Sequence, residues 1–181
     1  LLPFVGLIII LFLLKIWPFG DASLAFWDAN SQYVDFLSYL KDVLEGRQSW
    51  TYSFSRTLGG GTLTLLGYYL FSPFNLLVLF FEKAQMAEAF TLIYVIKLCF
   101  AGVTCRYYLK RYAQKSAVLL GCSTAYALCA YCFAYGFNIM WLDAVIALPL
   151  MAAGLDRVLK GQSPLLYLLS LFYGLISCYY T

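Results

Sequence analysis

Two aspartates, Asp28 and Asp143, are the best candidates for catalysis in this sequence. Asp28 opens a polar stretch at residues 28–33, and Asp143 is the only charge in residues 138–143. A carboxylate can serve as a general base toward a hydroxyl group, and two carboxylates on one side of a membrane can hold a divalent cation. Both also have a structural interpretation, because aspartate often caps the start of a helix. The residues alone leave these roles open, and a divalent cation is the one cofactor they suggest.

Three further features could contact a phosphate. Lys97 lies in the middle of an apolar block, where an ammonium group is costly and needs a carboxylate, a phosphate or a wet cavity. Arg56 is a second candidate, although an exposed loop arginine is usually only solvated. The run of Gly59, Gly60 and Gly61 is either a hinge or a place where backbone approaches a lipid-linked phosphate. No Lys-Ser/Thr pair follows the glycines, so the sequence does not support a nucleotide P-loop.

The cysteines do not indicate a metal or redox site. There are six, and Cys129 and Cys132 have CxxC spacing, but all six lie in apolar blocks where a thiol behaves as a small hydrophobic group. The sequence contains no histidine. Catalysis by Ser-His or Cys-His pairs and imidazole metal sites are therefore excluded.

The composition predicts a membrane protein that holds these residues on helices. Hydrophobic residues make up 63% of the chain and charged residues 12%. Apolar blocks of roughly the 20 residues needed to span a bilayer alternate with short polar segments. We expect an all-α, polytopic helix bundle in a single transmembrane domain. The predicted blocks are 1–19, 86–109, 117–137, 144–159 and 165–181, with a further apolar segment at 62–81. The chain starts without Met and stops inside an apolar run, so we expect a piece of a longer protein.

A long polar loop, residues 20–61, separates the first block from the rest. It contains five of the nine carboxylates of the chain. Apolar residues recur at helical spacing after Tyr33, which predicts an amphipathic helix that ends at Gly46. Loops of this length in compact proteins are usually functional or disordered. The loop is therefore where the sequence places the chemistry.

Charge predicts the topology. Four cations and no carboxylate surround the loop at 110–116, and two more flank residues 161–164, so both loops are predicted to be cytoplasmic. The loop 20–61 is then extracytoplasmic, and five helices span the membrane. The segment 62–81 must start and end outside, as a re-entrant or interfacial element, and Gly67 and the Ser72-Pro73 step break its middle. The four tryptophans fall at or near the outer ends, where amphipathic rings favour the headgroup level.

These segments together resemble the YfhO family of bacterial membrane proteins, regarded as glycosyltransferases of the GT-C type. The resemblance covers nearly the whole chain and rests on the order and spacing of short motifs. The motifs are Asp28-x-x-x-Gln32-Tyr33, the glycine run before Tyr68-Tyr69-x-x-Ser72-Pro73-x-Asn75-Leu76-Leu77, Asn138-x-x-Trp141-Leu142-Asp143 and Leu148-Pro149-Leu150.

The resemblance implies an enzyme of the bacterial cell membrane. It would take a sugar from a polyprenyl-phosphate carrier and transfer it, with inversion, to a cell-envelope acceptor such as a teichoic-acid-type polymer. GT-C enzymes carry a catalytic aspartate in the first outer loop, and Asp28 is at the matching position. Asp143 is the second catalytic candidate. The expected substrate-binding residues are Gln32, Tyr33, Arg56, Gly59, Gly60, Gly61, Tyr68, Asn75, Lys97, Asn138 and Trp141.

Two other classes of function fit the same residues. A transporter or flippase would also use a broken re-entrant segment, a lysine inside the membrane and outer carboxylates. A non-catalytic membrane scaffold would need neither Asp28 nor Lys97. The expected partners are the lipid bilayer, the lipid-linked sugar and the acceptor polymer, and no nucleic acid is expected. We do not expect residues 1–181 alone to be active.

Overall fold

The computed structural model of the chain describes residues 2–54 and 58–178. Helices dominate, as the all-α prediction requires, and two short strands, β1 (Tyr52–Ser53) and β2 (Gly60–Gly61), pair antiparallel. The helices of the first half are α1 (Leu2–Leu13), η1 (Ala29–Tyr33), α2 (Val34–Leu44), α3 (Leu63–Leu65), η2 (Leu66–Leu70), η3 (Pro73–Phe80) and η4 (Lys83–Gln85). Those of the second half are α4 (Met86–Leu109), α5 (Ser116–Ala127), α6 (Ala130–Ala134), α7 (Trp141–Leu159) and α8 (Leu165–Ser177).

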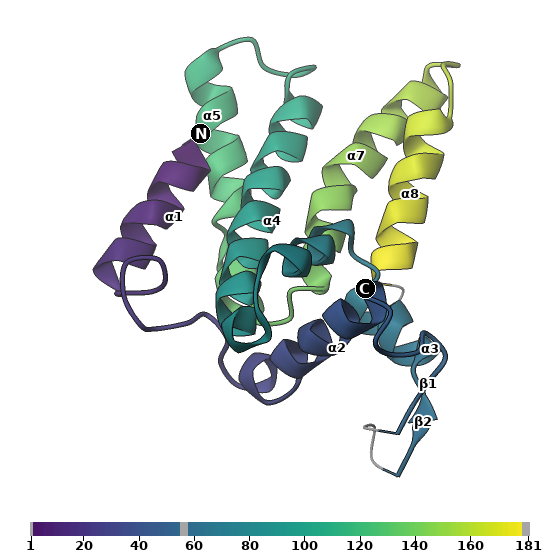
Figure 1. Cartoon of the computed structure of the whole chain (residues 1–181). Coiled ribbons are helices and arrows are strands. Elements are labelled where there is room, and N and C mark those ends of the chain that lie inside the picture. The colour runs from purple at the N-terminus through teal and green to yellow at the C-terminus, as the bar shows by residue number, and fades with distance from the viewer. Residues whose placement is uncertain (1, 55–57, 179–181) are drawn as a thin grey trace.

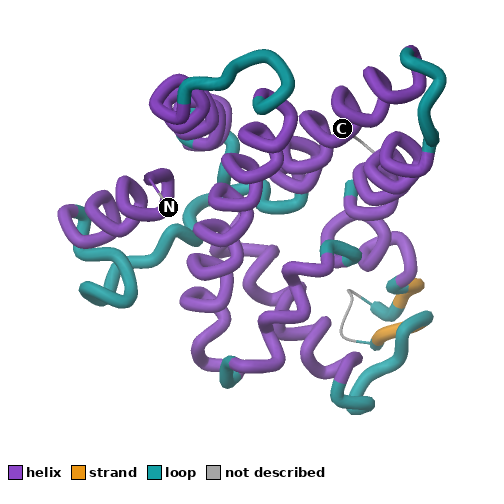
Figure 2. The backbone as a smooth tube through the Cα atoms, turned by 90° about the horizontal axis from the view of Figure 1, so that it is seen from above, coloured by secondary structure: helices purple, strands orange, loops and turns teal. Residues whose placement is uncertain are grey.

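The helix α4 is the centre of the bundle. It packs against α1 and α5 on one side and against α7 on another, and α8 packs against α7 (Figures 1 and 2). Phe90, Ile93 and Leu98 of α4 are fully buried, which fits a helix surrounded by others. The helices α7 and α8 approach closely because Gly154 faces the backbone of Tyr167, where any side chain would collide.

Two helices in the described residues are long and apolar enough to cross a bilayer, Lys83–Leu109 and Ser116–Ala134. The apolar helices Pro3–Leu13 and Leu165–Ser177 are shorter. The helix α7 has 19 residues but carries Asp143, Asp156 and Arg157. The chain is therefore an all-α membrane protein, and the crossing of the bilayer by five helices stays a prediction.

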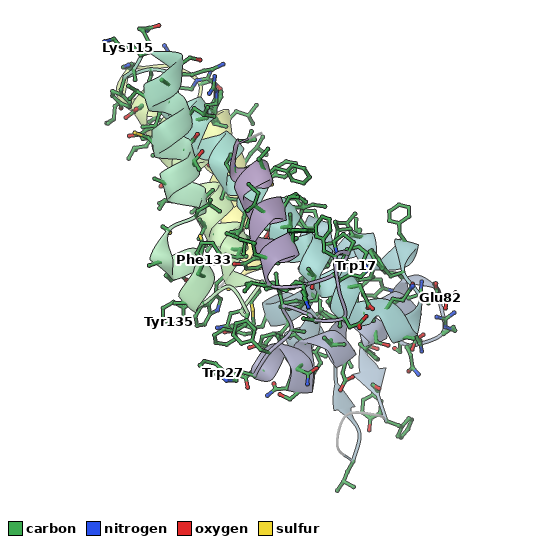
Figure 3. The ribbon with its side chains drawn as sticks, turned by 90° about the vertical axis from the view of Figure 1, so that its left-hand side faces the viewer. Trp17, Trp27, Glu82, Lys115, Phe133 and Tyr135 are labelled. Carbon is green, nitrogen blue, oxygen red and sulfur yellow. The ribbon has the colours of Figure 1, made fainter. Side chains whose placement is uncertain are left out.

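The polar segments lie at two opposite ends of the bundle. The α4–α5 and α7–α8 loops lie together at one end, while α2, α3 and the β1–β2 hairpin lie at the other (Figure 1). In a side view, Lys115 marks the first end, and Trp27 and Glu82 lie toward the second (Figure 3). We call the first the basic end and the second the loop end. This arrangement agrees with the predicted topology, in which both basic loops share one side and residues 20–61 face the other.

The predicted amphipathic helix in the long loop is confirmed as α2, preceded by the π-helical turn η1. Its Leu37, Leu40 and Val43 are buried against α4 and η3, whereas Asp35 faces solvent. Gly46 follows the helix with a positive φ of 76°, a conformation that glycine adopts without strain. The periodicity of the sequence therefore located this helix correctly.

The segment 62–81 is bent sharply. The helices Leu63–Leu70 and Pro73–Phe80 meet at 96°, and Ser72 between them is extended. The missing N–H of Pro73 stops the first helix, as the sequence predicts. Such a bend occurs both in a broken span and in a re-entrant element, so the re-entrant interpretation of 62–81 stays a prediction.

Three predicted boundaries differ from the structure. The first block is predicted to cover 1–19, but α1 ends at Leu13 and turns follow it. The block 117–137 forms α5 and the short α6, because Cys129 takes an extended conformation between them; no proline or glycine marks this break in the sequence. The helix α7 begins at Trp141 rather than at 144. Asp143 therefore belongs to the first turn of a helix and not to the tight turn before it.

Candidate functional site

The most deeply buried polar group of the described chain centres on Asp143. Its Oδ2 lies 2.6 Å from Nζ of Lys97, and both side chains have no exposed surface. Nζ of Lys97 also donates to the carbonyl oxygen of Ile139 at 2.8 Å. Removing charges from water costs several kcal/mol per ion, so a pair at this depth persists only when its remaining hydrogen bonds are satisfied. The expected partner of Lys97 is thus a carboxylate of the same chain.

Two hydroxyl groups satisfy the other carboxylate oxygen. Ser72 and Tyr173 both donate to Oδ1 of Asp143, at 2.9 Å and 2.5 Å. The four residues come from the bend before η3, from α4, from α7 and from α8. Asp143 therefore holds four elements of the bundle together, and both of its oxygens are engaged.

A second set of contacts connects the long loop to the segment that precedes Asp143. The hydroxyl of Tyr33 donates to Oδ1 of Asn138 at 2.7 Å, and both residues are buried. Burial raises the pKa of Tyr33 above its usual range, so this hydroxyl stays protonated and donates. Three residues further on, at the start of α7, Nε1 of Trp141 donates to the hydroxyl of Tyr68 at 3.4 Å. Residues 138–143 therefore contact the loop and the buried ion pair at once.

Asp28 is exposed at the loop end and forms no hydrogen bond or ion pair within residues 2–54 and 58–178. It holds the N-cap position of η1, but its side chain makes no capping bond. Its neighbour Trp27 has a φ of 51° and is 75% exposed, and its ring contacts Phe26 and Phe137 at centroid distances of 5.9 Å and 5.4 Å. Bulky residues rarely adopt positive φ, and such strain concentrates at functional sites. Asp28 is thus a free carboxylate next to an exposed aromatic surface.

The two catalytic candidates do not share a contact. Asp143 is enclosed by Ser72, Lys97 and Tyr173, whereas Asp28 faces solvent. In the described ranges, no three Cys, Asp or Glu side chains gather in a group that could hold a metal ion. The expected pairing of these carboxylates is therefore not present in this conformation.

The other candidates lie in several places. Gln32 is exposed on η1, next to the buried Tyr33. Asn75 is buried and donates to the carbonyl oxygens of Tyr69 and Leu70, so its amide stabilises the bend of segment 62–81. Arg56 lies outside the described residues.

The glycine run is part of the β1–β2 hairpin. Gly60 and Gly61 form β2, and Gly59 has a φ of 102°, a conformation that residues with a side chain rarely adopt. The backbone therefore favours glycine at position 59, which supports neither the hinge nor the phosphate interpretation of the whole run.

Ion pairs fix α2 at the loop end. Asp42 contacts Lys83 at 2.5 Å and Arg47 at 2.8 Å, and Glu45 pairs with Lys41 and with Arg47. Burial alone would raise the pKa of Asp42, but hydrogen bonds from Lys83 and Arg47 lower it below its usual value. These carboxylates position α2, which carries Tyr33 at its start, rather than act on a substrate.

An apolar groove of about 560 Å³ begins beside Trp141 and runs along α7, between α5 and α8. Its walls include Tyr126, Leu148, Leu171 and Leu175. The groove is lined almost entirely by carbon, so it suits a hydrocarbon chain rather than a sugar.

The sequence did not single out Ser72 as a ligand of Asp143, nor Tyr173 at all. Ser72 was visible only as part of a helix break, and a tyrosine in an apolar helix is common at membrane depth. The one signal was Lys97, because a buried cation requires an acceptor and hydroxyl donors often complete such a site.

Comparisons with known proteins show a match to a family of bacterial membrane proteins. Residues 1–181 match the family described as "Bacterial membrane protein YfhO". The chain is 26% identical to "Uncharacterized protein YfhO" of Bacillus subtilis (strain 168) over 193 aligned positions, which cover 93% of this chain and 21% of that protein. The chain thus spans about one fifth of the length of this relative. No solved structure matches the chain significantly.

Proposed function

Because the chain belongs to the YfhO family of bacterial membrane proteins, we propose that it forms the donor-side part of a GT-C type glycosyltransferase. The enzyme would move a sugar from a polyprenyl-phosphate carrier to an extracytoplasmic acceptor such as a teichoic-acid-type polymer. The observation that carries the proposal is Asp28, an exposed carboxylate without a partner in the described chain. Its neighbour Trp27 lies toward the loop end, which is predicted to face outward (Figure 3).

In the proposed reaction, Asp28 accepts the proton of an acceptor hydroxyl. The hydroxyl oxygen attacks the anomeric carbon from one face, while the bond to the lipid phosphate breaks on the other face and the phosphate leaves with the electron pair. The configuration at the anomeric carbon is inverted. A carboxylate that is solvated and not hydrogen-bonded is free to take the proton, which Asp143 is not.

For Asp143 we propose a positioning role in place of catalysis. Its bonds to Ser72, Lys97 and Tyr173 fix the start of α7, and Asn138 just before that helix receives the hydroxyl of Tyr33. Asp28 lies only five residues before Tyr33 in the sequence. The hydrogen bond between Tyr33 and Asn138 therefore holds the loop segment that carries Asp28 against the bundle.

The apolar groove supports the choice of a lipid-linked donor. It starts at Trp141, whose indole N–H reaches Tyr68, and continues between α5 and α8 in the direction of the bundle axis. An isoprenoid chain in this groove would bring its phosphate to the loop end, toward which Trp27, the neighbour of Asp28, lies (Figure 3). A hydrocarbon wall next to polar groups is the usual design of such sites.

The test uses the full-length protein in membranes with a polyprenyl-phosphate sugar and an acceptor polymer. We expect Asp28→Asn to lower sugar transfer by about 10²–10⁴-fold, the range for loss of a general base. Asp35→Asn is the matched control, because Asp35 is also an exposed carboxylate of the same loop. Normal transfer by Asp28→Asn, or an equal loss in the control, would contradict the proposal.

A lipid-sugar flippase is the second candidate, and the 96° bend of segment 62–81 beside a buried ion pair favours it. A flippase would move a labelled lipid-linked sugar between leaflets without changing it. If lipid crosses the membrane at the normal rate in Asp28→Asn and no sugar is transferred by the parent protein, the flippase is the better explanation.

A further inference from the structure

A small polar pocket lies at the basic end, far from Asp28. It has a volume of about 180 Å³ and is lined by Arg111, which follows α4, and by Asp156, Arg157, Lys160 and Gln162 of α7 and the loop after it. Since a water molecule occupies about 30 Å³, the pocket has room for a phosphate with a small headgroup and not for a whole lipid.

Arg111 is held in place by three contacts. Nη1 donates to the carbonyl oxygen of Ala153 at 3.2 Å and to Oδ2 of Asp156 at 2.9 Å, and the guanidinium lies 5.4 Å from the ring centroid of Tyr108. Nε and Nη2 have no partner among the described residues. A guanidinium fixed in this way presents its remaining donors without a further loss of side-chain entropy, which favours an anion with two acceptor oxygens.

The charges of the pocket are not balanced by the protein. Its only carboxylate, Asp156, is already engaged by Arg111 and by the hydroxyl of Tyr112 at 2.6 Å. Arg157 and Lys160 form no ion pair within the described part of the chain. The pocket therefore presents Arg157, Lys160 and the Nε and Nη2 donors of Arg111, a set of charges and donors that is complementary to a phosphate.

The surroundings indicate where that phosphate comes from. Leu155, Val158 and Leu159 of α7 are exposed close to the pocket in sequence, and Leu159 is 77% exposed. A free phosphate would gain nothing from these apolar side chains, whereas a phospholipid would bury its acyl chains on them. Basic pockets between helices at the cytoplasmic side are known to bind anionic headgroups.

We propose that this pocket binds the phosphate of an anionic phospholipid of the phosphatidylglycerol type. Arg111, Arg157 and Lys160 contact the phosphate, Gln162 contacts a headgroup hydroxyl, and the acyl chains lie along the exposed face of α7. The site fixes the cytoplasmic end of α7, the helix whose other end carries Asp143.

The test compares two pairs of variants of the full-length protein, purified in detergent. Gln162→Glu places a carboxylate in the pocket, and Gln114→Glu makes the same change on the other exposed loop of the basic end. Arg157→Gln with Lys160→Gln removes two cations from the pocket, and Lys110→Gln with Lys115→Gln removes two outside it. The count of phosphatidylglycerol molecules retained is measured by native mass spectrometry, and thermal stabilisation is measured with phosphatidylglycerol, phosphatidylcholine or inorganic phosphate added.

We expect the pocket variants to lose one retained phosphatidylglycerol and about 10-fold or more in apparent affinity, while each control stays within about 3-fold of the parent. Equal losses in pocket variants and controls would show a diffuse basic surface and overturn the proposal. Equal stabilisation by phosphatidylcholine would also overturn it. Stabilisation by inorganic phosphate as strong as by phosphatidylglycerol would show a free-phosphate site in place of a lipid site. Gln162→Glu changes an exposed loop residue, so it keeps the test valid if the double variant does not fold.

Discussion

Replacing Lys97 by methionine is the sharpest test of the buried network around Asp143. The side chain of methionine fills nearly the same space but removes the ammonium group that contacts Oδ2 of Asp143 at 2.6 Å. Because neither residue has exposed surface, the carboxylate would stay buried without a cation. Breaking a buried pair from one side typically costs about 3–5 kcal/mol of unfolding free energy. Ser72 and Tyr173 still donate to Oδ1, so we expect the lower part of that range.

The double variant Lys97→Met with Asp143→Asn shows whether this cost comes from the unpaired charge. The amide oxygen of the introduced asparagine can still accept from Ser72 and Tyr173, and no buried charge remains. We expect the double variant to recover at least about 2 kcal/mol relative to Lys97→Met, since neutral pairs often replace buried ion pairs at little cost.

The assay is denaturant unfolding of the purified protein in mixed micelles, followed by tryptophan fluorescence. Lys110→Met is the control, because Lys110 is an exposed lysine with no ion pair in the described chain. A loss below about 0.5 kcal/mol for Lys97→Met would refute the reasoning, since surface substitutions already reach that size. If the double variant is no more stable than Lys97→Met, the charge is not the source of the cost.

Three further predictions follow from the same structure. Tyr33→Phe leaves the buried Oδ1 of Asn138 without its donor, so we expect a loss of about 1–3 kcal/mol of unfolding free energy in the same denaturant assay. The control Tyr39→Phe should change stability little, because the hydroxyl of Tyr39 donates to an exposed carbonyl oxygen. A smaller loss for Tyr33→Phe than for Tyr39→Phe would contradict this. Asp42→Asn should cost about 1 kcal/mol or less at pH 7, and this cost should shrink as the pH falls below about 4. The folded pKa of Asp42 is lowered, so its contribution is present above the unfolded value near 3.9 and is lost as the pH falls through the folded pKa. A series of unfolding midpoints from pH 7 downward checks this, and a difference that grows toward low pH would contradict it. The topology is tested by cysteine labelling: a cysteine in place of Ser31 should react with an impermeant thiol reagent added outside intact cells, and one in place of Gln114 should not. The opposite result would show that the loop end faces the cytoplasm and the basic end faces outward.

Local patterns in the sequence predict local structure well here. The spacing of Leu37, Leu40 and Val43 located α2, and the Ser72-Pro73 step located the bend, because both depend on residues within one or two turns of each other. The break between α5 and α6 was not predictable in this way, since Leu128 and Cys129 carry no conformational signal.

The candidate site was predictable only in part, because its contacts are distant in the sequence. The need of Lys97 for a partner followed from its depth, but its partner is 46 residues away on another helix, and Ser72 and Tyr173 come from two more elements. The sequence paired Asp143 with Asp28 instead, since both were predicted to lie on one side of the membrane. In the structure α7 begins about one turn before its predicted start, and the surrounding helices enclose Asp143. No rule of residue spacing predicts this enclosure.

The position of residues 138–143 also limits how this protein can be engineered. Asn138 accepts from the loop, Ile139 accepts from Lys97, and Asp143 receives three further contacts, all within six residues. One inserted residue would turn the helix by about 100° and separate these acceptors from their donors. Epitope tags and fusion junctions therefore belong in the exposed α4–α5 loop at Gln114, which does not line the polar pocket of the basic end, and not in the turn before α7.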